Sequence, residues 1–224
     1  MKNIYFLILL LIVSNLNSQA SIDCNSNLSI FAEYYKVKNY EADYEPWMSV
    51  RKECPKINPA IYFQGSRMLE EFIKTSDDES KIAYQDDLLK LYDEWLINFP
   101  AYNGRSIVGQ IMSNKAQKMI DYKLATKTEI FDLFENAYQT DPVSFDDPKP
   151  LYNYFKTYFE LYKAGNGDIT LNQIFNKYEE LSERYNSIID EYSKQIDIII
   201  NKENSGIALT SREKRNKRVY EISK

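Results

Sequence analysis

Side chains that commonly carry catalysis or bind metals are scarce in this sequence of 224 residues. It has no histidine, which excludes Ser-His-Asp and Cys-His nucleophilic sites, histidine-ligated zinc and imidazole acid–base catalysis. The remaining candidates are carboxylates, and three adjacent pairs stand out: Asp77-Asp78, Asp86-Asp87 and Asp146-Asp147. Neighbouring residues on a helix point about 100° apart, so no pair by itself converges on one substrate.

We therefore predict no enzyme, no cofactor and no metal site. A carboxylate-dependent hydrolase is the minor alternative, and two buried carboxylates that face each other in a cleft would support it.

The two cysteines, Cys24 and Cys54, offer redox chemistry instead. An even number of cysteines in an exported protein suggests a disulfide, and two free thiols are the alternative. In an antiparallel helical hairpin the first helix begins beside the end of the second. With helices near 27–37 and 40–54, both cysteines would lie at the same end, so the geometry allows a bridge.

The first twenty residues predict export. Lys2 supplies a positive start, residues 4–13 are an unbroken apolar core, and Ser18-Gln19-Ala20 forms a small-x-small cleavage site, as in a secretory signal peptide. Ten apolar residues rise only about 15 Å as a helix, half a bilayer, so a permanent anchor is the weaker alternative. We predict cleavage after Ala20, a periplasmic or extracellular location, and no transmembrane segment in the mature chain.

The amino-acid composition limits the classes of partner that the mature chain is expected to bind. The full sequence has a formal net charge of −5, and an acidic balance argues against nucleic acid as the main partner. Six glycines and seven prolines leave little scope for low-complexity linkers. We expect one domain over residues 21–203, because a chain of this length can bury a sizeable core.

The periodicity of apolar residues predicts helices nearly throughout. In segments 82–99, 107–120 and 151–162 apolar residues recur at steps of three and four, which is the spacing of one helix face, and no sustained alternation indicates a strand. Capping boxes, in which a hydroxyl and a later side chain bond each other's backbone N–H, fit three sites: Ser76 with Glu79, Thr126 with Glu129, and Thr170 with Gln173. We predict an all-α fold of antiparallel helical hairpins at 27–54, 59–99, 106–141 and 149–203.

The last predicted helix, 171–203, is about 50 Å long at 1.5 Å per residue. Its apolar residues form a heptad seam made of Ile174, Tyr178, Leu181, Tyr185, Ile188, Tyr192 and Ile199. A partner helix at 151–163 is too short to cover it, so other hairpins or something outside these 224 residues must do so. The segment 204–224 is a basic tail, with its basic run at 211–218, and we expect Thr210 or Ser211 to begin a further helix there.

A sequence pattern that ends in proline occurs three times, at Pro55, Pro100 and Pro142. An aromatic residue stands eight positions before each proline and an apolar residue stands five before. The aromatic residues are Trp47, Tyr92 and Phe134, and the apolar residues are Val50, Trp95 and Ala137.

This pattern resembles the tetratricopeptide repeat, in which the second helix carries an aromatic residue, then a small residue, and ends at a proline. The match is closest in "YYKVKNYEADYEPWMSVRKECP" and "EIFDLFENAYQTDP". Two departures are Asp43, where the pattern has alanine, and Phe31, where it has a small residue. The spacing also exceeds the family's 34 residues. The resemblance implies an α-solenoid of long, degenerate repeats that ends in a long helix.

Most of residues 24–220 also resemble exported tetratricopeptide-like proteins of the Bacteroidota, which share the opening "FAEYYKVKNYEADYEPWMSVRKECP". In tetratricopeptide repeats the first helix of each unit lines a concave groove. By this resemblance four residues would face a partner: Ser29, Ala32, Tyr35 and Lys36. Tyr35 is preferred to its neighbour Tyr34, which belongs to the apolar stripe.

Together these features predict a non-enzymatic exported protein that acts as a scaffold for other proteins or peptides of the cell envelope. Stacked hairpins present an extended binding surface, which suits such a role. The alternative is a protein that binds a small molecule or a glycan in an aromatic groove. A deep pocket lined by Tyr and Trp would favour the alternative.

Overall fold

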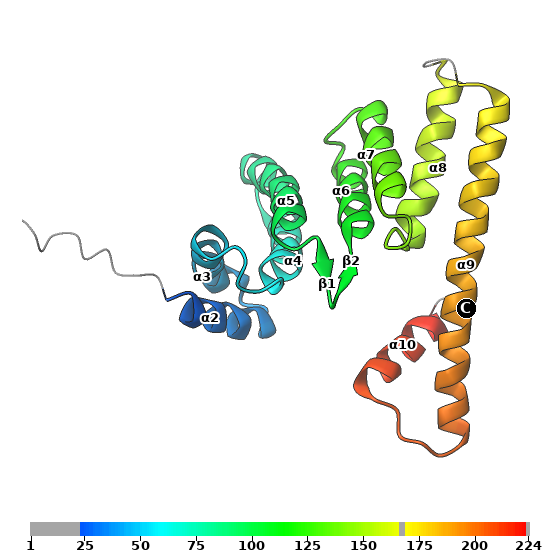
Figure 1. Ribbon diagram of the computed structural model, residues 1–224. Helices are drawn as coiled ribbons and strands as arrows, with labels where there is room; N and C mark the ends of the chain where they lie inside the picture. Colours follow the sequence, from blue (N-terminus) through cyan, green and yellow to red (C-terminus); the bar gives the residue numbers. More distant parts are fainter. Residues whose placement is uncertain (1–22, 166–168, 223–224) are drawn as a thin grey trace, which may run out of the picture. The chain divides into compact units, whose positions relative to one another are not determined.

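The computed structural model describes residues 23–165 and 169–222, so the predicted signal peptide lies outside the described residues. The described chain is helical apart from one short antiparallel pair of strands, Ala101–Tyr102 (β1) and Arg105–Ser106 (β2) (Figure 1). The all-α prediction is confirmed. The chain divides into two compact units, Met1–Phe99 and Pro100–Lys224, which we call the N-terminal and C-terminal units.

The N-terminal unit consists of two antiparallel hairpins whose second packs against the first (Figure 1). Its helices are α2 (Cys24–Lys36), α3 (Tyr40–Glu53), α4 (Ala60–Thr75) and α5 (Asp78–Asn98). These bounds lie within a few residues of the predicted hairpins at 27–54 and 59–99.

Aspartates cap two helices of this unit, α2 and α5. Asp23 caps α2 by accepting hydrogen bonds from the backbone N–H groups of Asn25 and Ser26, both at 3.1 Å. The predicted cap of α5 at Ser76 is wrong by one residue, because Asp77 accepts the bond from the N–H of Ser80 at 2.9 Å. A carboxylate is favoured there because it also meets the positive end of the helix dipole.

The core of the N-terminal unit centres on Trp47, whose side chain is fully buried. Its indole N–H donates to the carbonyl oxygen of Ile61 at 2.7 Å, which joins α3 to α4. A Cβ at Gly65 would lie only 2.5 Å from the indole nitrogen, so glycine at this position lets the two helices approach.

Cys24 and Cys54 form a disulfide with their Cα atoms 6.2 Å apart, as predicted. The bridge joins the first residue of α2 to the C-cap of α3. It closes the hairpin over a sequence separation of 30, which in the loop-entropy model stabilises the fold by about 3 to 4 kcal/mol.

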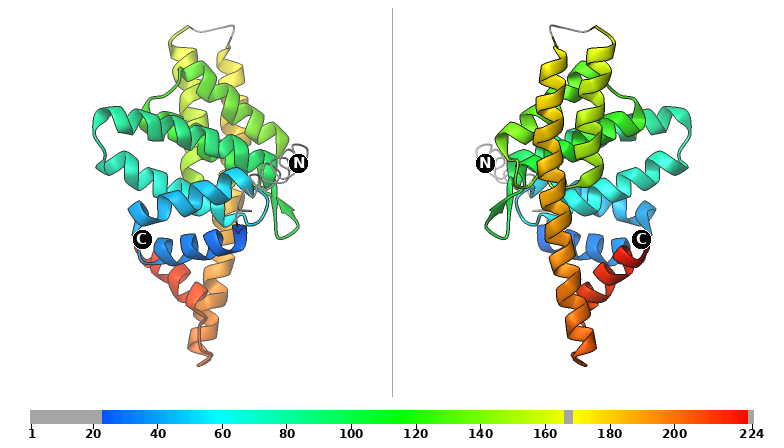
Figure 2. Two further views of the ribbon diagram at one scale, coloured as in Figure 1. Left: turned by 90° about the vertical axis from the view of Figure 1, so that its left-hand side faces the viewer. Right: turned by 90° about the vertical axis from the view of Figure 1, so that its right-hand side faces the viewer.

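The C-terminal unit contains the β-hairpin and two further helical hairpins, and its last helix packs against the long one (Figures 1 and 2). Its helices are α6 (Val108–Tyr122), α7 (Lys127–Thr140), α8 (Pro148–Lys163), α9 (Leu171–Asn204) and α10 (Ser211–Ile222). The predicted hairpins at 106–141 and 149–203 correspond to α6–α7 and α8–α9.

Threonine capping boxes begin two of these helices, as predicted, with Thr126 before α7 and Thr170 before α9. A third pair of reciprocal bonds begins α10, where Thr210 and Glu213 bond each other's backbone N–H at 3.2 and 2.8 Å. The pKa of Glu213 is lowered to about 2, first because Lys202 of α9 donates to it at 2.6 Å and then because Thr210 does. This ion pair fixes α10 against α9.

The recurring pattern that ends in proline corresponds to the same type of helix end in three helices. Each proline follows the C-cap residue of α3, α5 or α7, and each C-cap has nearly the same backbone angles, with φ of −135°, −140° and −153°. The cap N–H bonds the carbonyl of the apolar residue five before the proline: Val50, Trp95 and Ala137. A proline disfavours helical angles in the residue before it, so the spacing read from the sequence marks where these three helices end.

Candidate functional site

The predicted α2 surface is present as one exposed strip. Ser29, Ala32 and Lys36 are exposed and follow one another at steps of four or fewer, so they share one side of α2. The hydroxyl of Ser29 donates to the carbonyl of Asn25 at 2.8 Å within the same helix. These side chains offer little apolar area to a partner.

Tyr35, the fourth predicted residue, is half-buried. Its ring centroid lies 6.1 Å from that of Phe31 and 5.7 Å from that of Tyr40, so it packs within the α2–α3 hairpin. Its neighbour Tyr34 is 38% exposed. Tyr34 is therefore the more exposed of the two tyrosines, whereas the prediction prefers Tyr35 as the surface residue. The reason is that Tyr35 lies on the same side of α2 as the buried Phe31.

A larger apolar surface lies on α9, which carries two stripes. Ile174, Leu181 and Ile188 are 3–4% exposed and form the buried stripe. The second stripe steps by four and three residues, and its large side chains are 39–57% exposed; it consists of Leu171, Phe175, Tyr178, Ser182, Tyr185, Ile189 and Tyr192.

The predicted heptad seam is therefore buried at its aliphatic positions and exposed at its three tyrosines. Tyr178, Tyr185 and Tyr192 lie on the outer side of the seam and are 55%, 39% and 52% exposed. Gln195, which falls on the next position of the same heptad spacing, is exposed, and the adjacent Ile196 is buried instead.

The neighbouring helix α8 presents a matching stripe. Tyr152 is 62% exposed, Phe159 is 39% exposed, and Phe155 between them is half-buried. The ring of Phe155 meets that of Tyr178 edge-on, with 5.6 Å between their centroids. This contact joins the two outer stripes into one surface, which we call the aromatic face.

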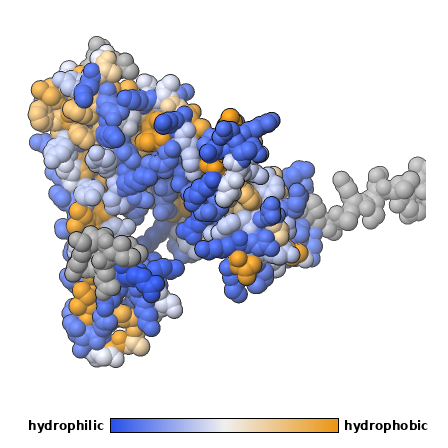
Figure 3. Space-filling model, turned by 180° about the vertical axis from the view of Figure 1, so that it is seen from behind, coloured by the Kyte–Doolittle hydropathy of each residue, from blue (hydrophilic) through white to orange (hydrophobic). Residues whose placement is uncertain are grey.

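The two helices that carry the aromatic face, α8 and α9, lie side by side in the right panel of Figure 2. In Figure 3, hydrophobic residues gather at the upper left, over the region of α8 and α9. A hollow of about 570 Å³ opens between the two helices. Its aromatic walls are Tyr152, Phe155, Tyr178 and Tyr185.

The two long edges of the aromatic face carry opposite charges. Lysines recur every seven residues along α8, at Lys149, Lys156 and Lys163, and acids line the outer side of α9. Helical geometry places both groups beyond the aromatic stripes, on the side away from the core. The acids are Glu179, Glu183 and Asp190, all exposed.

A second hollow of about 570 Å³ in this unit adjoins a charged cluster. Tyr154 donates to Glu135, and the Lys177 ammonium lies 3.3 Å from the same carboxylate and 3.0 Å from Glu180. Burial acts to raise the pKa of Glu135, but the Tyr154 hydrogen bond and the Lys177 charge outweigh it, so the pKa lies below its ordinary value.

Burial and the bond to Glu135 together raise the pKa of Tyr154. This cluster thus pairs a carboxylate of lowered pKa with a phenol of raised pKa. General acid–base catalysis near neutral pH needs a group that titrates there, so the cluster suits ionic anchoring of α9 to α7.

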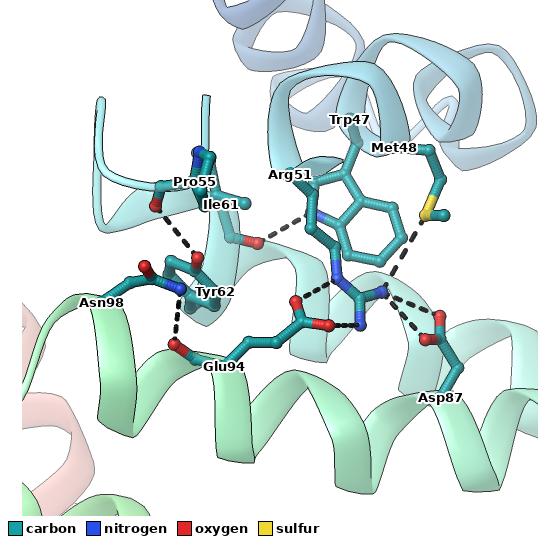
Figure 4. A network of polar contacts seen from close by, with 9 residues as sticks. All are labelled: Trp47, Met48, Arg51, Pro55, Ile61, Tyr62, Asp87, Glu94 and Asn98. Carbon is teal, nitrogen blue, oxygen red and sulfur yellow. Dashed lines mark hydrogen bonds and ion pairs between the residues drawn. The ribbon is translucent and has the colours of Figure 1, made fainter. Parts of the chain in front are cut away.

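Arg51 forms the main polar network of the N-terminal unit (Figure 4). It is 7% exposed, and its guanidinium binds both oxygens of Asp87 at 2.9 and 3.0 Å and both oxygens of Glu94 at 2.7 and 3.0 Å. It also lies 5.0 Å from the centroid of the Trp47 ring. Burial opposes its charge, but the bonds to Glu94 and Asp87 leave its pKa above the ordinary value. The network ties α3 to α5, and its three charged residues line a hollow of about 420 Å³.

Asp43 is a buried carboxylate on the same helix, with a fully buried side chain. Neither of its oxygens has a hydrogen-bond partner, and burial raises its pKa to about 7. That pKa would suit a general base, but full burial leaves no route for a substrate to reach it.

The three acidic pairs have separate structural roles. Asp77 and Asp147 cap α5 and α8, and Asp87 pairs with Arg51. Among residues 23–165 and 169–222, no group of three or more acidic or cysteine side chains is arranged to hold a metal ion. In the same ranges, no helix combines the length and apolarity of a membrane span.

Searches against protein-family models, curated proteins and solved structures find no match for this chain. The aromatic face is accordingly defined by geometry alone. The sequence does contain a signal for this face, in the heptad spacing of α9. Leu171, Phe175 and Ile189 lie outside the predicted seam, and together with its tyrosines they form a second heptad stripe.

Proposed function

We propose that this chain is a non-enzymatic exported helical-repeat protein that acts as a protein–protein interaction scaffold in the cell envelope. The observation that carries the proposal is the aromatic face of α8 and α9. Large apolar patches exposed on a protein surface mark interaction sites. Tyrosine is well suited to such a site because it brings a large contact area at small entropic cost.

Two further observations support the proposal. The Cys24–Cys54 disulfide is typical of proteins that fold in an oxidising compartment. The repeated helix end before Pro55, Pro100 and Pro142 is the feature on which the resemblance to tetratricopeptide repeats rests, and proteins of that class bind other proteins on extended surfaces.

Site-specific crosslinking tests the proposal and separates the two candidate surfaces. A photoreactive residue is placed at Tyr178 on the aromatic face, at Lys36 on the α2 strip, and at Asp86, exposed on α5, as the control. We expect reproducible protein adducts in envelope fractions from position 178 and none from position 86. Adducts from position 36 alone would move the interaction to α2, and no adduct from either surface would contradict the proposal.

A second candidate function is the binding of a small molecule or glycan, favoured by the 570 Å³ hollow between α8 and α9. Its aromatic walls and the polar Lys149 and Asn186 at its rim could stack on and hydrogen-bond a sugar. A glycan array probed with the protein and with a Tyr152→Ala, Tyr185→Ala variant tests this. Binding of a defined glycan that the variant loses would support it, and an empty array would exclude it.

A further inference from the structure

The outer stripe of α9 fits a helix as its partner. From Leu171 to Tyr192 the stripe advances at alternating steps of four and three, with Ser182 as its one polar position. This is the 3.5-residue period that helices adopt when they pack side by side in a left-handed supercoil. The hairpin itself does not need these residues, because the buried stripe of Ile174, Leu181 and Ile188 already faces the core. The partner should therefore be a helix or a pair of helices.

The aromatic face is large enough for a stable complex. Eight of its large apolar side chains are 39–62% exposed, and at roughly 100 Å² each they offer about 800 Å², the amount that one partner buries in a standard interface. These residues are Tyr152, Phe159, Leu171, Phe175, Tyr178, Tyr185, Ile189 and Tyr192.

The charged edges select the partner. The face has a basic edge along α8 and an acidic edge along α9. The Phe155–Tyr178 ring contact places Lys156 and Glu179 within about 3 Å of the same height, because each lies one residue, about 1.5 Å along its helix, from that contact. Lys149 already pairs with Asp121 at 3.1 Å within the chain, so Lys156 is the clearest donor to a partner.

A second copy of the same face complements these edges. With a twofold axis parallel to the helices, α8 of one copy lies over α9 of the other, and each lysine edge meets the partner's acidic edge at the same height. A twofold axis across the helices would instead set lysine beside lysine. Homodimers use such self-complementary patches, and opposed charges at the rim fix the register.

We infer that a second copy of this chain covers the aromatic face, forming a twofold dimer in which α8 packs over the partner's α9. This inference rests on the proposed function, since it names one partner of the same surface. The Tyr and Phe side chains form the centre of the interface, and Lys156 of each copy pairs with the partner's Glu179.

Sedimentation equilibrium of the purified exported chain tests the dimer. We expect a concentration-dependent dimer that Tyr178→Glu with Tyr185→Glu abolishes. Tyr34→Glu, at an exposed tyrosine of α2, should leave it intact. Circular dichroism checks that each variant is folded. A monomeric wild-type chain, or a dimer that ignores the aromatic-face substitutions, would overturn the inference.

Charge reversal tests the symmetry directly. Lys156→Glu or Glu179→Lys alone should weaken the dimer at least about tenfold, because each places like charges at both symmetric contacts. Mixing the two variant chains should restore the wild-type affinity, since both contacts in the mixed dimer join opposite charges. Failure of the mixture to associate would exclude the α8-over-α9 arrangement.

These experiments distinguish a failure of the dimer inference from a failure of the proposed scaffold function. A monomeric chain that still crosslinks through position 178 to another protein would keep the proposed function and overturn the second-copy inference. A chain without crosslinks to itself or to another protein would overturn both.

Discussion

The α2–α3 and α8–α9 hairpins are built from similar residues but use their aromatic side chains in different ways. In α3, Trp47 is fully buried and its N–H is bonded to Ile61, while a disulfide closes the hairpin. In α9, Tyr178 and Tyr192 are more than half exposed. Aromatic content alone therefore does not distinguish buried positions from exposed ones.

The two hairpins differ in how much of the surface of α3 and of α9 contacts the rest of its own unit. Both sides of α3 are used within its own unit, since Arg51 reaches Asp87 and Glu94 on α5 and Trp47 contacts α4. α9 has its aliphatic stripe against its own unit and its aromatic stripe in solvent. Substitutions should accordingly affect stability in the first hairpin and association in the second.

The largest expected effect is that of Trp47→Ala, which should lower the free energy of unfolding by about 3 to 5 kcal/mol, because it leaves a cavity beside Gly65 and removes the indole hydrogen bond to the Ile61 carbonyl. Urea unfolding monitored by circular dichroism measures it. A loss below about 1 kcal/mol would show that Trp47 is not the centre of the core.

Removal of the disulfide should have the next largest effect. Cys24→Ser with Cys54→Ser should cost about 3 to 4 kcal/mol by loop entropy, and reduction of the wild-type protein should give the same loss. Thiol counting on the unreduced protein is the control, and two reactive thiols there would contradict the bridge.

Asp43 should make stability depend on pH. Its pKa is raised from 3.8 to about 7 in the folded state, so the folded chain binds more protons than the unfolded chain in this range. Stability should fall as the pH rises between these two values, by about 2 to 3 kcal/mol from pH 5 to pH 8, and should level off above pH 7.

Asp43→Asn should remove this slope, and the exposed Asp86→Asn should retain it. Parallel pH profiles of thermal unfolding for Asp43→Asn and the wild type would refute an unpaired buried carboxylate at this position.

Helix caps should contribute equally in the two hairpins. Asp23→Ala before α2 and Thr170→Ala before α9 should each cost about 1 kcal/mol, because each leaves backbone N–H groups without a partner. Chemical denaturation of both variants, with Ser29→Ala on the exposed side of α2 as the control, compares them. A cost confined to one hairpin would mean that the other helix end is fixed by tertiary packing.

The smallest effect on stability is expected at the aromatic face. Tyr178→Ser should change the unfolding free energy of the dilute protein by no more than about 0.5 kcal/mol, as at other surface positions, although it removes a tyrosine. Thermal unfolding at low protein concentration checks this. A loss near that of Trp47→Ala would place Tyr178 in the core and remove the contrast between the hairpins.

The sequence by itself determined the helices and most of their ends. Proline after a C-cap and threonine three residues before Glu or Gln act through local backbone bonds, so Pro55 and Thr170 could be read without tertiary structure. Ser76 was misassigned because Asp77 beside it competes for the same cap, and the stronger acceptor won. The Cys24–Cys54 bridge could be predicted from the even number of cysteines together with the geometry of a helical hairpin.

Only the tertiary structure decided which apolar stripe is covered. Tyr178 and Ile174 lie in one heptad pattern, and the pattern has the same period on both sides of the helix, so spacing cannot tell which side meets α8. The ion pairs of Arg51 likewise depend on residues 36 and 43 positions away. Local rules fix helices because their bonds are local, whereas surfaces arise from packing between helices.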